Sequence, residues 1–198
     1  MEQLVTCNLY SHISILSNSS SAGIKVRHLT FEGLLEIHSQ VSNLPKDRIR
    51  FKNKANLDYC IETTEDRDEA LGLVDKLIDM TAHHLRCPSV ASGFSNYNKI
   101  TAYQAADTFL RANRFQLSIK ESEIDDVVLL MRDITAGNVS LQNIKDWIRK
   151  HIMPFPSNWQ KPVVSEETET IPVDEVKDIS AIATMENAAS FKALTEIT

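Results

Sequence analysis

Cysteine is scarce in this chain, and its spacing is unlike that of a disulfide framework or a zinc site. Only three cysteines occur among 198 residues, and none belongs to a C-x-x-C pair. They are Cys7, Cys60 and Cys87, which lie far apart in the sequence. Disulfide-rich domains and zinc knuckles have denser and more regular cysteine patterns. We therefore expect reduced thiols and a cytoplasmic location.

Long hydrophobic runs are also missing. The longest apolar stretches have only a few residues, whereas a membrane-spanning helix needs about 20. The first sixteen residues contain Glu2 and neither Lys nor Arg, so they lack the charged start of a signal peptide. The adjacent pair His83 and His84 has no Glu or Asp at a metal-ligand spacing, and neighbours on a helix point in different directions. The sequence thus predicts no membrane segment and no metal site.

The net charge of −6 is concentrated near the end of the chain. From Trp159 onward there are eight Asp or Glu residues and three Lys residues, which leaves the rest of the chain nearly neutral. A nearly neutral body is unlike a protein that binds nucleic acid directly. Acidic residues and prolines with few large apolar side chains predict a flexible acidic tail over residues 155–198. Within it, residues 179–191 could form one amphipathic helix, which we expect to be a docking or linker element.

Hydrophobic periodicity predicts a mainly helical protein with a small β-hairpin. Residues 1–28 alternate loosely and are typical of a β or loop segment, and residues 29–154 are predicted to form a domain of about five or six helices. A capping box at 66–69 precedes one of them. The hairpin is predicted over 46–62, because its apolar residues alternate with polar ones. Caps, prolines and glycines place the helices from Thr30 to Pro45, from Ala70 to near Pro88, from Asn98 to Asn113, from Ser122 to Gly137 and from Ser140 to near Pro154.

The first strand of the predicted hairpin is basic. It contains Arg48, Arg50, Lys52 and Lys54. These charges either form a solvated edge that prevents strand association, or contact an acidic target or a nucleotide. His38 also has two interpretations, as a half-buried packing residue or as the partner in a buried polar network. The sequence leaves both choices open.

A motif of chemical interest runs from Ser92 to Asn113 and has the sequence S-G-F-S-N-Y-N-K-I-T-A-Y-Q-A-A-D-T-F-L-R-A-N. It resembles the signature of the Fic/Doc (death-on-curing) family, H-x-F-x-x-G-N-K-R-T followed by an apolar helix that ends in F-L-R-x-N. Phe94, Asn98, Lys99 and Thr101 match the first part of this pattern. The second part is matched by the residues Phe109, Leu110, Arg111 and Asn113. Three positions differ, because the chain has Ser92, Tyr97 and Ile100 where the family has histidine, glycine and arginine.

The resemblance implies a Fic/Doc-like helical domain and a protein of the toxin–antitoxin type. Such proteins transfer a phosphoryl or nucleotidyl group from a nucleotide, here ATP with Mg, to a Ser, Thr or Tyr hydroxyl of a target protein. By resemblance, Asn98, Lys99 and Thr101 would bind phosphate or nucleotide, Phe94 would anchor the motif, and Ser92 holds the catalytic position. The resemblance also implies a protein target or an antitoxin-like partner, and a flap in the region of the predicted hairpin.

The three differences predict that the transfer chemistry is degenerate. A serine hydroxyl does not act as a general base near neutral pH, and losing such a base typically costs about 10²–10⁴-fold in rate. Tyr97 places a side chain in the expected path of the phosphates, and Ile100 removes a fixed cation. His83 and His84 lie on the preceding helix, and we do not expect either to replace the base. The alternative is a non-enzymatic interaction module on an unrelated helical fold.

Overall fold

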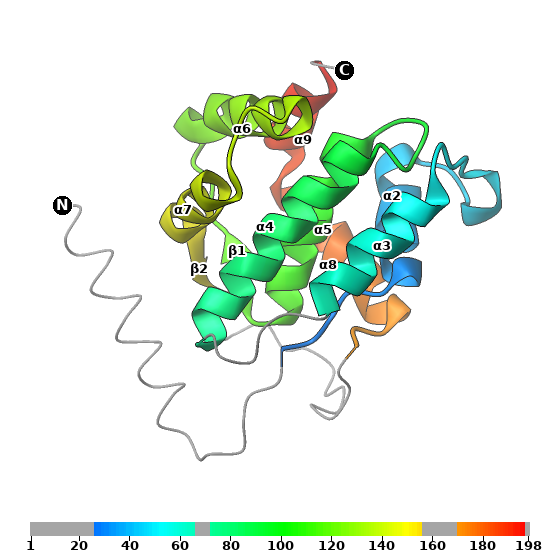
Figure 1. Ribbon diagram of the computed structural model, residues 1–198, viewed down its shortest axis with the longest axis horizontal. Helices are drawn as coiled ribbons and strands as arrows, with labels where there is room; N and C mark the ends of the chain where they lie inside the picture. Colours follow the sequence, from blue (N-terminus) through cyan, green and yellow to red (C-terminus); the bar gives the residue numbers. More distant parts are fainter. Residues whose placement is uncertain (1–25, 66–71, 156–169, 197–198) are drawn as a thin grey trace, which may run out of the picture.

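Helix α5 (Asn98–Ala112) runs through the centre of the protein, and thirteen of its fifteen residues are buried. The computed structural model describes residues 26–65, 72–155 and 170–196 of the chain. Helices α2, α4 and α8 pack directly against α5 (Figure 1). Ala102, Ala105 and Ala106 are fully buried, and their small side chains allow the neighbouring helices to approach closely.

The described residues form eight α-helices, two short 3-10 helices and one antiparallel sheet of two strands. The predicted fold class, mainly helical with a small β-element, is therefore confirmed. Six of the helices, α2 to α7, lie within residues 29–154. Besides α5, the helices are α2 (Phe31–Ser42), α3 (Lys54–Glu65), α4 (Leu73–Ala91), α6 (Ile124–Ala136), α7 (Leu141–His151), α8 (Val173–Glu186) and α9 (Ala188–Thr195), with η1 (Lys46–Arg48), η2 (Glu121–Glu123), β1 (Phe115–Leu117) and β2 (Ile152–Pro154).

Several helix ends follow from local capping chemistry. The Thr30 hydroxyl accepts a hydrogen bond from the Gly33 N–H at 3.1 Å, and α2 begins at the next residue after Thr30. Ser140 caps α7 in the same way, by accepting from the Asn143 N–H at 3.1 Å. Gly137 ends α6 with a φ of 73°, a left-handed conformation that favours glycine. These predicted caps are confirmed, although α6 begins at Ile124 after the η2 turn and not at Ser122.

The prediction of a hairpin over 46–62 is wrong. Residues 54–65 form α3, and the small sheet pairs β1 with β2, with Leu117 opposite Ile152. The misleading feature was an alternation that includes Tyr59, whose side chain is 65% exposed. Leu57, Cys60 and Ile61 are buried instead, and their spacing of three and four residues is that of one helix face.

Helix α4 continues beyond its predicted end near Pro88 and stops at Ala91. A proline in a helix removes one backbone hydrogen bond, but burial of Pro88 and Ser89 against the core stabilises this last part of α4. Cys87, in the same turn, forms a disulfide with Cys60 of α3, and the two Cα atoms are 5.6 Å apart. The expectation of reduced thiols is therefore wrong for this pair, while Cys7 lies outside the described residues.

The expectation of a flexible tail is wrong for residues 170–196. This segment contains α8, which packs on α2 and α5, and α9, which packs on α6. Its apolar residues Val176, Ile179 and Ala183 are buried at helical spacing, while Asp174 and Asp178 are exposed. Asp174 and Asp178 thus belong to the outer face of α8, whereas Glu175 is buried and forms an ion pair with Arg27. The helix is part of the core and not a separate docking element.

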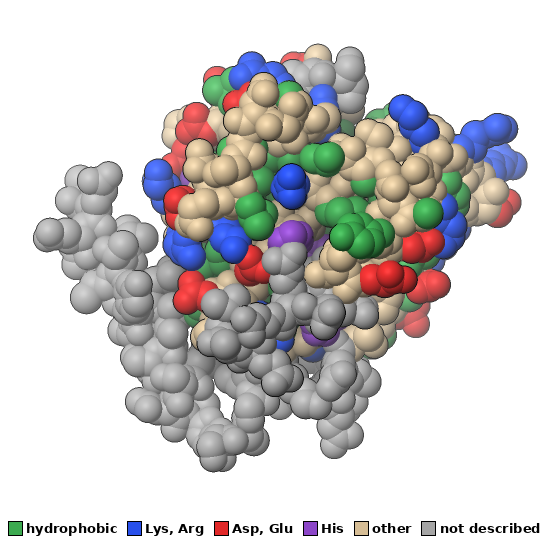
Figure 2. Space-filling model, viewed as in Figure 1, with side chains coloured by type: hydrophobic (Ala, Val, Ile, Leu, Met, Phe, Trp, Pro, Cys, Tyr) green, Lys and Arg blue, Asp and Glu red, His purple; other side chains and the backbone are tan. Residues whose placement is uncertain are grey.

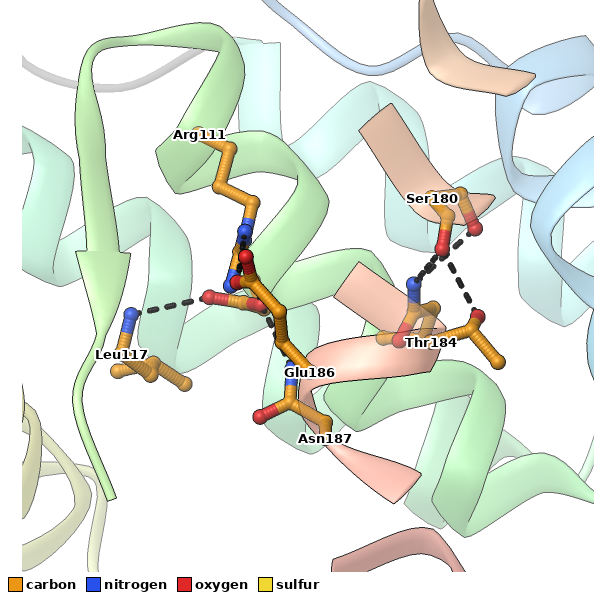
Figure 3. Close-up of polar contacts among 8 residues, drawn as sticks. Arg111, Leu117, Ser180, Thr184, Glu186 and Asn187 are labelled. Carbon is orange, nitrogen blue, oxygen red and sulfur yellow. Dashed lines mark hydrogen bonds and ion pairs between the residues drawn. The ribbon is translucent and has the colours of Figure 1, made fainter. Parts of the chain in front are cut away.

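Polar contacts attach this C-terminal segment to α5 (Figure 3). The Gln104 side-chain amide donates to the Ser180 carbonyl at 2.7 Å, and the Asn187 amide donates to the buried Asp107 carboxylate at 2.9 Å. Arg111 forms an ion pair with Glu186 at 2.6 Å. Contacts of this kind fix both the position and the rotation of α8 on α5.

Residues 1–25 of the expected N-terminal segment, the capping box at 66–69 and residues 156–169 of the expected tail lie outside the described residues. The division into segments 1–28, 29–154 and 155–198 stays a prediction. Within the described ranges, no helix combines the length and the apolar character that crossing a membrane requires.

Candidate functional site

The loop that connects α4 to α5 carries the motif, and the Asn98 side chain closes it. Its Oδ1 accepts from the Phe94 N–H at 3.0 Å, and its Nδ2 donates to the Phe94 carbonyl at 2.9 Å. Asn98 is also the first residue of α5, so one side chain fixes the loop onto the start of the helix. The first-turn amides of α5 therefore lie directly after a loop that these two hydrogen bonds close.

Tyr97 occupies the position where the Fic/Doc signature has glycine, and its φ is 54°. This left-handed conformation is easy for glycine but costs a residue with a Cβ about 1–2 kcal/mol. Tyr97 is the N-cap of α5, and its side chain makes no capping hydrogen bond. The loop thus has a backbone that suits glycine, although the chain supplies a bulky residue.

Phe94, His38 and Thr101 form a buried cluster behind the loop. The rings of Phe94 and His38 stack with their centroids 3.7 Å apart, and His38 Nδ1 lies 2.9 Å from the Thr101 hydroxyl. Burial lowers the pKa of His38 to about 4, so the imidazole is neutral at pH 7. Of the two interpretations of His38, the partner in a buried polar network is confirmed. The Thr101 side chain lies inside the protein and supports the loop from within.

The remaining motif positions lie at the end of α4 and in the first turn of α5. Ser92 follows the end of α4 with a φ of 44°, and Lys99 lies in the first turn of α5; both are partly exposed. Ile100 is only 4% exposed, so its side chain points into the core. The binding roles of Asn98, Lys99 and Thr101 and the catalytic position of Ser92 stay predictions.

His84 packs on the core side of α4, with its ring centroid 4.9 Å from that of Phe109. Burial, together with the nearby His83 and His28, lowers the pKa of His84 to about 3. Phe109 is near the end of α5 opposite to Asn98, about 16 Å away at 1.5 Å per residue. His84 therefore does not face the motif loop.

The basic segment between α2 and α3 lies alongside the motif loop. Phe51 and Phe94 form an antiparallel bridge, the Lys52 N–H donates to the Gly93 carbonyl at 2.7 Å, and the Ser95 N–H donates to the Arg50 carbonyl at 3.1 Å. Figure 2 shows Lys and Arg side chains gathered at the edge of the molecule where Figure 1 places this segment. The sequence indicated the charges, but not that they would lie beside Phe94.

A surface pocket of about 580 Å³ opens between this segment and the loop. Arg48 and Arg50 contribute positive charge to its lining, Asp47 contributes one negative charge, and the buried His38 forms part of it. Leu44, Ile49, Ser95 and Asn96 complete the lining. Two arginines thus line the pocket beside polar residues of the loop, and arginine is a residue type suited to anions.

Gly93 allows α3 to pack against the loop, and this gives a testable prediction. A Cβ at this position would overlap the Leu57 side chain of α3. We expect Gly93→Ala to lower the free energy of unfolding by about 1–3 kcal/mol, measured by urea denaturation, because the packed core must rearrange. Gly72→Ala is the matched control, since nothing lies within 4 Å of the added Cβ there. Equal stability of the two variants would show that the α3–loop contact is loose.

Two further findings bear on the identity of the site. Across residues 26–65, 72–155 and 170–196, no cluster of three or more His, Cys, Asp or Glu side chains has an arrangement that could hold a metal ion. No protein-family model matches the chain, and comparison with curated proteins gives no significant match.

Proposed function

We propose that this chain is a Fic/Doc-type protein of the toxin–antitoxin kind that has kept an anion-binding loop and lost efficient transfer chemistry. The chemistry of its ancestors would be transfer of a phosphoryl or nucleotidyl group to a protein hydroxyl. One observation carries the proposal. The loop closed by Asn98 leads directly into α5, and Tyr97 adopts a left-handed conformation at the position where the family has glycine.

The loss of chemistry follows from the groups near the loop. Ser92 does not hold a proton-accepting nitrogen at the family's histidine position. His38 contacts Phe94 and lines the pocket, but burial lowers its pKa to about 4 and its Nδ1 is engaged by Thr101. A base with such a low pKa accepts a proton poorly at neutral pH. The site therefore favours binding over turnover.

The ligand that suits this surface is a nucleotide phosphate. The resemblance to the Fic/Doc family implies ATP with Mg. Arg48 and Arg50 belong to the pocket lining, a guanidinium can bind a phosphate through two hydrogen bonds, and Lys99 adds a cation at the start of α5. In the proposal, nucleotide occupancy accompanies binding of a protein target or an antitoxin-like partner.

The disulfide removes the basis of the cytoplasmic expectation, because that expectation depended on reduced thiols.

Labelled ATP tests the loss of chemistry. The full chain is incubated with a cell extract and ATP that carries its label on either the alpha or the gamma phosphate. We expect no protein labelling above that of a Lys99→Ala variant. Labelling by the natural chain that Lys99→Ala abolishes would contradict the proposed degeneracy and establish a working transferase.

Calorimetric titration with ATP and Mg tests the binding. We expect Arg48→Ala combined with Arg50→Ala to weaken binding about tenfold or more, because each guanidinium contact to phosphate is charge-assisted. Arg132→Ala is the control, since Arg132 is an exposed residue of α6 paired with Asp133. If the double variant and the natural chain bind ATP with equal affinity, the nucleotide does not bind in this pocket. Absence of any nucleotide binding by the natural chain would favour the alternative of an interaction module on an unrelated fold.

A further inference from the structure

The disulfide joins α3 to the end of α4 that leads into the motif loop. Cys60 lies in the middle of α3, and Cys87 lies in the last turns of α4. Cys60 is only 3% exposed, whereas Cys87 is partly exposed. A soluble thiol would therefore approach this bond from the side of Cys87.

Contacts from α3 and the residues just before it converge on the loop. Leu57 lies one turn before Cys60 on the same face and packs directly on Gly93. The Lys52 and Asn53 N–H groups both donate to the Gly93 carbonyl, at 2.7 and 3.0 Å. The Asn56 side chain donates to the carbonyl of Ala91 at 3.3 Å. The segment held by the disulfide thus supports the loop at several points.

Helix α3 has little other attachment within the described part of the chain. It packs mainly on α4, with a minor contact to α2. Its residues with described burial are largely exposed, apart from Leu57, Cys60 and Ile61. A twelve-residue helix of this kind is marginal without tertiary support. The covalent bond to Cys87 therefore adds a fixed link to the packing of α3 on α4.

We propose that the Cys60–Cys87 bond is a thiol–disulfide exchange site that takes a dithiol reductant, and that its redox state determines whether the motif loop is held in order. One thiolate of the dithiol attacks Cys87 Sγ, and Cys60 leaves as a thiolate and is protonated. The second thiol of the reductant then displaces Cys87, which is protonated in turn. Two electrons pass to the protein, two cysteine thiols form and the reductant becomes a disulfide. This proposal concerns loop order and does not depend on nucleotide binding.

Hydrogen exchange of the full chain, read by mass spectrometry with and without dithiothreitol, tests the switch. We expect peptides from α3 and residues 93–95 to exchange about tenfold faster after reduction, while peptides from α6 and α7 do not change. Cys60→Ser with Cys87→Ser should exchange like the reduced chain and be insensitive to dithiothreitol. Cys7→Ser is the control and should respond like the natural chain.

Three outcomes would overturn the proposal. The first is a bond that dithiothreitol does not reduce in the folded protein. The second is a confirmed reduction that leaves exchange at residues 93–95 unchanged. The third is faster exchange throughout the chain, which would make the bond a general structural link. ATP titration on the same samples separates this question from the proposed function, because a loop that loosens in a chain without nucleotide binding still supports the switch.

Discussion

Replacing Arg111 by alanine is expected to lower the free energy of unfolding by about 3–5 kcal/mol. The Asp107 carboxylate is fully buried, and burial raises its pKa. It accepts hydrogen bonds from Arg111 Nε at 2.8 Å, from the Leu117 N–H at 2.9 Å and from the Asn187 side chain at 2.9 Å. Without the guanidinium, a buried carboxylate loses its compensating charge, and this uncompensated charge is the reason for the large loss. Urea denaturation followed by circular dichroism measures it.

Glu186→Gln is the matched control, because it alters the same cluster (Figure 3) at its solvent edge. The Glu186 side chain is 54% exposed, and its ion pair with Arg111 is partly screened by water. We expect a change of less than about 1 kcal/mol for this variant. A similar small change for Arg111→Ala would contradict the buried-ion account and would show that water or rearrangement compensates Asp107.

This cluster gives a structural role to the residues that match the second part of the motif. Arg111 neutralises Asp107 and contacts the end of α8. The Asn113 side chain accepts from the Arg27 N–H at 2.9 Å and donates to the Phe109 carbonyl at 2.9 Å. The residues of F-L-R-A-N thus stabilise the C-terminal end of α5. A structural role of this kind persists whether or not the chain performs group transfer.

The parts of the fold that the sequence predicts correctly depend on local interactions. Thr30, Ser140 and Gly137 act through neighbours within a few residues, so their patterns suffice. The sequence predicts strands in the region of α3 because Leu57 and Ile61 fit both an alternating and a helical pattern. Only packing on α4 distinguishes the two, and that packing involves residues distant in the sequence. The disulfide was missed for the same reason, since cysteine spacing alone does not reveal which residues meet.

The candidate site likewise has one part that the sequence predicts and another part that it does not. The contact between Asn98 and Phe94 lies within one loop, and both residues belong to the motif that the sequence shows. The pocket depends on pairing of Phe51 with Phe94, and no local pattern specifies such a pairing. The buried position of Thr101 beside His38 also needs the packing of α2 on α5. The sequence therefore indicates the residues of the loop, while the pocket results from tertiary packing.

Installing the three residues of the Fic/Doc signature is expected to be tolerated at two positions and to destabilise the protein at the third. Ser92 is partly exposed, and Tyr97 is in a left-handed conformation that glycine adopts without strain, so Ser92→His with Tyr97→Gly should fold. Adding Ile100→Arg should lower the free energy of unfolding by a further 2–5 kcal/mol, roughly, because Ile100 is 4% exposed and an unpaired guanidinium would be buried. Thermal unfolding and ATP titration of the double and triple variants measure the difference.

A triple variant that is as stable as the double variant and binds ATP more tightly would show that residue 100 can face the phosphates. A less stable triple variant would mean that residue 100 serves the packing of the core, so that an arginine at this position requires further changes around it.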